Sequence, residues 1–369
     1  MATFDATGRL GPAREQIARF IADGEIGGAA LAVAVDGAPA AEWYAGEAAP
    51  GRAAGPETLW PLGSIAKSYT AAAVLALVER GTLTLGTPVR AVLPEFDGDG
   101  RERVQLRHLL THTSGLVYES PEMERRLVAR TPLDALVDEA YTYPLQFPPG
   151  AQFSYSDYGY ALAGRMATVA AGRPFPELVR ALVLDPAGLR DTFMPPPPDV
   201  QARLAHVRGV LAEGTDGAMY NSPYALALAH PAFGTVASVG DLLRFGLLFD
   251  PRGRRRIFAE ATVRAMTTDQ TDGHAAGGVI VGDPAAPQPW GLGFSVHGPG
   301  GRAGYGDLAL PGSFGHGGAT GCLLLIDPAD GIALAYVSNR HTRADPERFA
   351  FRLSAVVNGV LAALTRRGA

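Results

Sequence analysis

Lys67 is the only lysine of this chain, and it lies three residues after Ser64, in the segment Gly63-Ser64-Ile65-Ala66-Lys67. All the others of the 32 Lys and Arg residues are arginine. Arginine cannot be deprotonated in a protein, whereas burial or a nearby positive charge can drive a lysine amine toward its neutral form. A single lysine in an arginine-rich chain therefore indicates a site that needs a titratable amine.

The spacing of Ser64 and Lys67 suits a nucleophile and its base. Positions i and i+3 of a helix share a face, so the hydroxyl and the amine would point into the same space. At a helix N-terminus, free N–H groups and the helix dipole favour an alkoxide or an oxyanion. A base that works near neutral pH needs its pKa lowered from about 10.4 to about 7, which corresponds to roughly 4–5 kcal/mol.

Three further segments could contribute to the same site. Residues 153–160 follow Pro148-Pro149-Gly150, which places Tyr155 in a loop before a helix. Residues 315–319 precede an apolar strand, so we expect them at a sheet edge that faces a cleft. Residues 108–116 lie between the serine–lysine segment and Tyr155.

Other chemistries find less support in the sequence. His108 and His112 are spaced i, i+4, but no Glu follows His108 and no third ligand is indicated, so we expect a structural turn and no metal. The Gly-x-Ser-x-Gly elbow of α/β-hydrolases is absent. Cys322 lies within an apolar run, which indicates a buried strand position, and one cysteine allows no disulfide within the chain.

The four segments, in this order, resemble the serine β-lactamase and penicillin-binding superfamily, in particular its class C-like branch, which includes the family VIII carboxylesterases. The resemblance covers roughly residues 15 to 360. It implies that Ser64 is the acylated nucleophile and that Lys67 is its proton partner. It also implies that Tyr155 shares the base role and relays a proton to the leaving group.

The third motif of the superfamily is usually Lys-Thr-Gly, and His316-Gly317-Gly318 matches it here. The resemblance implies that the backbone N–H of Ala319 joins that of Ser64 as the oxyanion hole, where one donor is typically worth about 2.7–4 kcal/mol in the transition state. The implied chemistry is two-step acyl transfer through the serine, with no metal or organic cofactor.

Two positions depart from the superfamily pattern. His316 stands where a lysine helps to hold the substrate carboxylate, and a histidine with its ordinary pKa is mostly neutral at pH 7. Asp157 stands where the superfamily usually has asparagine, so it could either meet the substrate or simply cap a helix. A negative charge near Lys67 would favour the protonated amine and shift base work to Tyr155. Both departures disfavour a carboxylate-bearing lactam or peptide as the substrate.

The elements that must position these residues follow from the hydrophobic pattern. We expect helices over 11–22, 64–80 (closed by Gly81) and 346–365, and strands over 29–35, 41–45, 291–297, 321–327 and 331–338. Asp36-Gly37 predicts a tight hairpin turn between the first two strands. Strands at both termini and helices between them predict an α/β fold of the α+β type, with a β-lactamase-like antiparallel sheet and an inserted helical lobe.

We expect residues 1–63 together with 285–369 to form the sheet lobe and 64–284 to form the helical lobe, with the active site between them. A net charge of −5 gives no reason to expect nucleic acid as a partner. The N-terminus does not resemble a signal peptide, and we expect no stretch able to span a bilayer, so the predicted location is cytoplasmic. The sequence does not predict the oligomeric state.

The predicted function is the hydrolysis of small carboxylic esters through an acyl-Ser64 intermediate, so the expected partner is a small ester or another acyl donor. Tyr118 and Tyr220, in Gly- and Ser-rich loops, are the aromatic residues that we expect to contact the substrate. Three alternatives remain. One is an intracellular acyltransferase that uses the same acyl-enzyme, and another is a β-lactamase or D-amino-acid peptidase. The third is a non-catalytic binding or scaffold protein.

Overall fold

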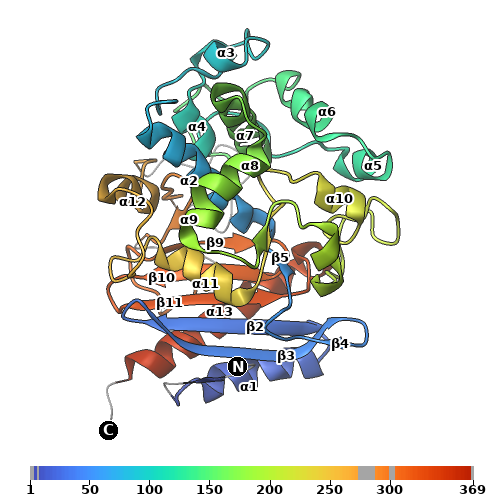
Figure 1. Ribbon diagram of the computed structural model, residues 1–369, viewed down its shortest axis with the longest axis vertical. Coiled ribbons are helices and arrows are strands. Elements are labelled where there is room, and N and C mark those ends of the chain that lie inside the picture. The colour runs from blue at the N-terminus through green and yellow to red at the C-terminus, as the bar shows by residue number, and fades with distance from the viewer. Residues whose placement is uncertain (1–3, 6–7, 273–286, 299–303, 367–369) are drawn as a thin grey trace.

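An antiparallel sheet built from both ends of the chain forms the base of the fold (Figure 1). The computed structural model describes residues 4–5, 8–272, 287–298 and 304–366. The strand order is β1-β3-β2-β11-β10-β9-β8, with β4 paired to β3. These strands are β1 (Phe4–Asp5), β2 (Gly28–Val35), β3 (Ala38–Ala49), β4 (Arg52–Ala53), β8 (Ser295–Val296), β9 (Phe314–Gly318), β10 (Cys322–Asp327) and β11 (Ile332–Ser338).

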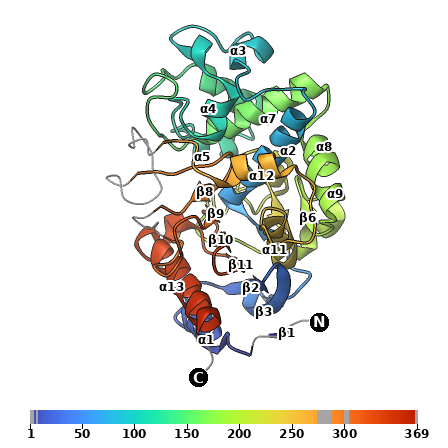
Figure 2. The ribbon, with the colours of Figure 1, turned by 90° about the vertical axis from the view of Figure 1, so that its left-hand side faces the viewer.

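Each face of the sheet packs against a different set of helices, because side chains alternate along the strands. Leu31, Val33, Leu323 and Leu325 belong to the core shared with α1 (Gly11–Ala22) and α13 (Pro346–Thr365). Their neighbours along the strands, such as Ala32 and Leu324, belong to the larger core under the remaining helices. Figure 2 shows α1 and α13 together on one side of the sheet.

The helical part lies on the opposite face of the sheet. Its longer helices are α2 (Ala66–Glu79), α7 (Asp157–Ala171), α11 (Val239–Leu247) and α12 (Glu260–Thr267). Shorter ones are α3 (Val89–Val92), α4 (Leu106–Leu110), α5 (Met123–Val128), α6 (Leu133–Asp138), α8 (Phe175–Val179), α9 (Asp185–Ala187) and α10 (Pro223–Ala227). The 3₁₀ turns are η1 (Gly63–Ile65), η2 (Arg101–Arg103), η3 (Glu139–Tyr141), η5 (Pro198–Arg203) and η6 (Thr342–Ala344), and η4 (Arg180–Leu184) is a π turn.

A small second sheet, in the order β5-β7-β6, joins the chain before Ser64 to the middle of the sequence. Its strands are β5 (Trp60–Pro61), β6 (Thr192–Phe193) and β7 (Val236–Ala237). Helix α11 packs on β2, β10 and β11, so part of the segment 64–284 covers the large sheet. The division into two lobes at these boundaries stays a prediction.

Most of the elements predicted from the hydrophobic pattern are present. Both helices at the termini, α1 and α13, have the predicted bounds. Asp36 and Gly37 both have positive φ, 49° and 74°, as a two-residue hairpin turn requires. The helix predicted over 64–80 begins as the 3₁₀ turn η1 and continues as α2, and Gly81 follows it with φ 72°.

Two predictions about strands were wrong. The strand predicted over 291–297 is reduced to Ser295–Val296, because Gly293 has φ 100° and breaks the extended chain before it. Residues 315–319 were expected at a sheet edge before a strand, but residues 314–318 form β9, which pairs with both β8 and β10. Three of its five residues are glycine, a type depleted in strands, so the pattern concealed it.

Helix α13 also corrects the expectation about membrane spans. The helix has 20 residues, and a window of 18 of them has a mean hydropathy of 1.2, which is enough by length and composition alone to cross a bilayer. In the fold, however, Val356, Val357, Val360 and Leu361 of this helix are buried in the core that it shares with α1 and the sheet. The apolar character of α13 is therefore used in packing against the sheet.

Candidate active site

Ser64 and Lys67 occupy the junction of η1 and α2. Ser64 is half-buried, and Lys67 is completely buried in the first turn of α2. The Lys67 Nζ lies 3.1 Å from the Ser64 Oγ and 3.2 Å from the carbonyl oxygen of Ala232. The spacing of three residues thus brings the hydroxyl and the amine together, as the sequence predicted.

Asp157 supplies a third contact to the same amine. Its Oδ1 lies 2.6 Å from the Lys67 Nζ, and the two side chains are 6% and 0% exposed. Ser156 is the cap of α7, because its Oγ accepts a hydrogen bond from the Gly159 N–H at 3.2 Å. Asp157 is therefore the first helical residue, and its carboxylate pairs with Lys67 and does not cap the helix.

Burial and charge act in opposite directions on this pair. Burial lowers the pKa of the Lys67 amine, and the Asp157 carboxylate opposes that change. Burial raises the pKa of the Asp157 carboxyl, and Lys67 opposes that change in turn. Burial thus makes the Lys67 amine easier to deprotonate, while the Asp157 carboxylate preserves part of the amine's affinity for its proton.

Tyr155 lies beside the amine and is held there by His112. The Lys67 Nζ is 4.7 Å from the centre of the Tyr155 ring, and Tyr155 is 5% exposed. The rings of His112 and Tyr155 are 4.3 Å apart, and the His112 Nδ1 accepts a hydrogen bond from the Ser156 N–H. His112 has φ 59°, in the left-handed region that residues other than glycine seldom adopt. Its backbone conformation is therefore specific to this position.

The two histidines that share a helical spacing have separate structural roles. The His108 Nδ1 accepts a hydrogen bond from the Gln105 N–H and so forms half of the capping box of α4. Sequence reasoning did not identify His112 as a supporting residue of the site, although its motif contained the signal. Within residues 4–5, 8–272, 287–298 and 304–366, no group of three or more His, Cys, Asp or Glu side chains could hold a metal ion.

The end of β9 lies directly against the turn that carries Ser64. A Cβ atom added to Gly318 would be 2.1 Å from the carbonyl oxygen of Leu62. One added to Gly63, which has φ 54°, would be 3.0 Å from the backbone nitrogen of Ala319. The two glycines therefore let the backbone at Ala319 approach the backbone at Ser64, the two positions predicted to form the oxyanion hole.

His316 points from β9 toward the aromatic side of the site. Its ring is 6.3 Å from that of Tyr155 and 5.3 Å from that of Trp290, which it meets edge to face. The His316 Nδ1 lies 2.7 Å from the carbonyl oxygen of Gly317. Gly317 faces the opposite side of the strand, since its register partner Leu323 belongs to the core on the α1 and α13 side. Trp290 was not among the predicted site residues, but it contacts two of them.

The two tyrosines predicted to contact substrate lie within electrostatic range of Asp157. The Asp157 charge and, to a lesser degree, burial raise the pKa of Tyr118. Burial and, to a lesser degree, the Asp157 charge raise the pKa of Tyr220. The Tyr118 ring is 6.0 Å from the Tyr155 ring, and its carbonyl accepts a hydrogen bond from the Asp157 N–H at 2.8 Å. Tyr220 has φ 68°, and its ring packs against Phe233 and His341.

Glu119 is a site residue that the sequence did not indicate. Its side chain is half-buried next to Tyr118, and no motif marks it. Burial and the charge of Asp157 raise the pKa of the Glu119 carboxyl to about 8, while Lys67 and Arg343 oppose the shift. The site therefore contains two acids close to one amine.

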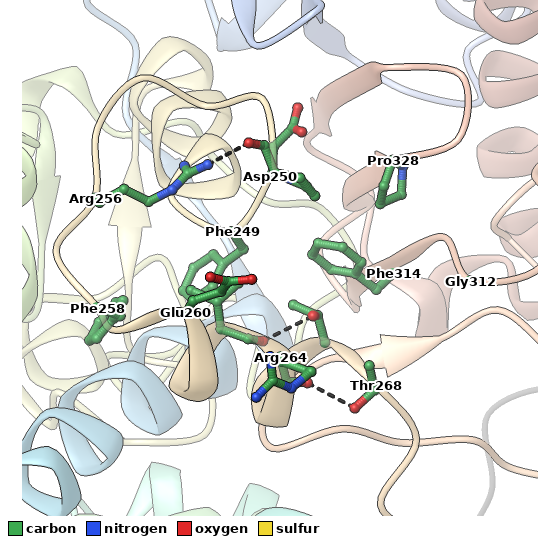
Figure 3. Close-up of a pocket in the computed structure, with 13 residues that line it drawn as sticks. Phe249, Asp250, Arg256, Phe258, Glu260, Arg264, Thr268, Gly312, Phe314 and Pro328 are labelled. Atoms are coloured by element: carbon green, nitrogen blue, oxygen red, sulfur yellow. Dashed lines mark hydrogen bonds between the residues drawn. The ribbon is translucent and has the colours of Figure 1, made fainter.

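A separate cavity of about 680 Å³ lies away from these residues, beside α12 and the start of β9 (Figure 3). Phe249, Phe258 and Phe314 form part of its wall, and the exposed Arg256, Glu260 and Arg264 stand around it. Ser64, Lys67 and Tyr155 are not among the residues that line it. This cavity is therefore not the candidate active site.

Comparison with known proteins places the whole fold in one family. The family model described as Beta-lactamase matches residues 13–358. The Esterase EstB of Burkholderia gladioli is 38% identical over 156 residues, which is 38% of this chain and 40% of the esterase, so this match spans less than half of either protein. The Penicillin-binding protein 4 of Amycolatopsis lactamdurans is 30% identical over 339 residues, 85% of this chain and 80% of that protein.

A solved structure supports the same fold. EstCE1, described as a hydrolase with promiscuous acyltransferase activity, superposes with a TM-score of 0.77 at 23% identity, over 95% of this chain and 99% of its own. At this identity the likeness concerns the fold alone. The predicted mixed α/β fold with an antiparallel sheet is confirmed.

Proposed function

The chain belongs to the β-lactamase family of serine hydrolases, and we propose that it cleaves small carboxylic esters through an acyl-enzyme on Ser64. The observation that supports this proposal most strongly is the contact of 3.1 Å between the Ser64 Oγ and the buried Lys67 amine. A serine is a weak nucleophile at neutral pH and needs an adjacent base, and an amine at hydrogen-bond distance meets that need. The partly identical esterase EstB supports the ester as the substrate.

In the first step, the Ser64 oxygen attacks the ester carbonyl while its proton passes to the Lys67 amine in its neutral form or to Tyr155 in its phenolate form. The negative oxygen of the tetrahedral intermediate is stabilised by the backbone N–H groups of Ser64 and Ala319. The bond to the alcohol then breaks, and the alcohol leaves with the proton. In the second step, water attacks the acyl-Ser64, which restores the serine and releases the carboxylic acid.

The test is the initial rate of p-nitrophenyl butyrate hydrolysis by the wild type and by Ser64→Ala. We expect activity in the wild type and its loss in the variant, together with a butyryl group on Ser64 in the mass spectrum of the quenched wild type. Ser154→Ala is a matched control, because its Oγ donates to the Gln146 Oε1 away from the amine. No activity in the wild type would contradict the ester as substrate.

A transacylase that uses the same acyl-enzyme is the second candidate function, supported by the likeness to EstCE1, a hydrolase with promiscuous acyltransferase activity. An added alcohol or amine would then take the acyl group in competition with water, which product analysis measures directly. Slow turnover of a chromogenic cephalosporin together with rapid ester turnover would favour the esterase and the transacylase over a β-lactamase. Failure of a fluorophosphonate probe to label Ser64 would favour a non-catalytic role.

A further inference from the structure

The ion pair between Lys67 and Asp157 sets the net charge of the site. We propose that Asp157 is a specificity-determining residue that cancels the charge of Lys67 and so makes the site select acyl donors without a carboxylate. This inference rests on the proposed ester hydrolysis. It names a substrate class for that activity and assigns the selection to one side chain.

The first observation is the completeness of the pairing. The Asp157 Oδ1 is 2.6 Å from the Lys67 Nζ, and both side chains are almost fully excluded from solvent. The remaining contacts of the amine, the Ser64 Oγ and the Ala232 carbonyl, are neutral. With solvent excluded, the charge of Lys67 is balanced by Asp157 at the point where a substrate meets Ser64.

The second observation is that two buried histidines of the site, His230 and His341, add no positive charge. Burial lowers the pKa of His230 to about 3, so its ring is neutral at pH 7, and its Nδ1 accepts a hydrogen bond from the Ala232 N–H. Burial likewise lowers the pKa of His341 to about 4. Arg343 lies 4.0 Å from the Glu124 carboxylate. Glu119 adds a negative charge whenever it is ionised.

The third observation concerns His316, which lies on β9 within the part of the chain that the Beta-lactamase family model matches. Its Nδ1 lies 2.7 Å from the Gly317 carbonyl, an interaction in which the ring nitrogen donates its proton to the strand. That proton is thus directed to the backbone and away from any substrate. A carboxylate that enters the site would lose its hydration, and the balanced pair of Lys67 and Asp157 would supply no net positive charge to offset that loss.

Asparagine at position 157 would keep the shape of the side chain and remove its charge. At about 7–10 Å and an effective dielectric constant of about 20, one unit charge changes the relative binding of an anion roughly ten- to fifty-fold. The substitution should therefore act on the charge of the substrate and not on its shape. This separates a specificity role from a purely structural one.

The experiment compares two esters that share the acyl group, 4-(butyryloxy)benzoate and its neutral methyl ester, methyl 4-(butyryloxy)benzoate. Each kcat/KM is divided by the rate of the same ester with hydroxide, which removes the difference in intrinsic reactivity. We expect the wild type to prefer the neutral ester at least tenfold. In Asp157→Asn, this preference should fall roughly ten- to fifty-fold at a pH below the acid limb of the variant, where Lys67 is protonated in both proteins. Asp157→Glu, which keeps the charge, should retain the wild-type preference.

Equal normalised constants for the two esters in the wild type would overturn the inference without any variant, so it does not depend on the folding of Asp157→Asn. An unchanged preference in a folded Asp157→Asn that is labelled at Ser64 by a fluorophosphonate would also overturn it. In both cases the neutral ester is still hydrolysed, and the proposed function stands. Hydrolysis of neither ester by the wild type would instead contradict the proposed function.

Discussion

The Cα of Gly318 lies so close to the carbonyl oxygen of Leu62 that a Cβ atom added there would be 2.1 Å from that oxygen. Side-chain carbons do not approach backbone oxygens this closely, so position 318 accepts glycine and nothing larger without a shift of the backbone. Leu62 immediately precedes η1, and Gly318 ends β9. The contact therefore fixes the distance between the sheet and the turn that carries Ser64.

Gly318→Ala should push the end of β9 away from η1 and displace the Ala319 N–H. Loss of one oxyanion donor typically lowers kcat about 10²–10³-fold, and we expect a loss of that size for p-nitrophenyl butyrate. Gly317→Ala is the matched control on the same strand, because its Cβ would meet nothing nearer than the Cys322 carbonyl oxygen at 3.9 Å. Similar kcat values for the two alanine variants would contradict this role of Gly318.

Lys67→Arg should keep the ion pair with Asp157 and remove the titratable amine. Arginine remains protonated at all accessible pH values, so it cannot accept the Ser64 proton. We expect kcat/KM for p-nitrophenyl butyrate to fall about 10²–10⁴-fold, the usual contribution of a general base. Thermal melting checks that the variant is folded. A folded variant with nearly wild-type kcat/KM would assign the base role to another group, with Tyr155 the first candidate.

Asp157→Asn should also move the pH dependence of ester hydrolysis. The Asp157 carboxylate stabilises the protonated form of Lys67 and so raises the Lys67 pKa, whereas burial lowers the Lys67 pKa. Removal of the carboxylate leaves burial unopposed, so the pKa of Lys67 falls and more of the amine is neutral at a given pH. The acid limb of kcat/KM for the neutral ester should shift to lower pH by about one unit or more.

The control for this profile is Glu119→Gln, which removes the neighbouring acid and leaves the contact between Lys67 and Asp157 in place. An acid limb that moves with Glu119→Gln and not with Asp157→Asn would show that Glu119 is the titrating group. If the acid limb were unchanged in Asp157→Asn, Lys67 would not be the base whose titration produces that limb.

Glu119 should also make the protein less stable as the pH rises. Its folded pKa of about 8 lies above the ordinary value of 4.5, so between these pH values the folded state binds more protons than the unfolded state. The free energy of unfolding therefore declines across this window. Glu119→Gln should flatten the decline by on the order of 2–4 kcal/mol between about pH 5 and pH 8. Urea unfolding at the two pH values measures it, and parallel curves for wild type and variant would contradict the assignment.

Local patterns were sufficient to predict much of the fold. The continuous apolar runs of β10 and β11, the turn at Asp36-Gly37 and the apolar spacing of α13 each depend on residues close together in the chain. The pairing of β9 did not follow from such a pattern, because its glycines have no side chains to show a period. Only its neighbours in the sheet and the close approach to η1 account for glycine at these positions.

The sequence by itself determined that Ser64 and Lys67 would face each other, because a helix places residues i and i+3 on one face whatever surrounds it. The tertiary structure decided that Asp157 pairs with that lysine, that His112 supports Tyr155 and that Glu119 lies beside them. These contacts join α2, the start of α7 with the loop before it, and the segment before α5, which are far apart in the chain. Their charges are set by burial and by neighbours, and both exist only once the segments have packed together.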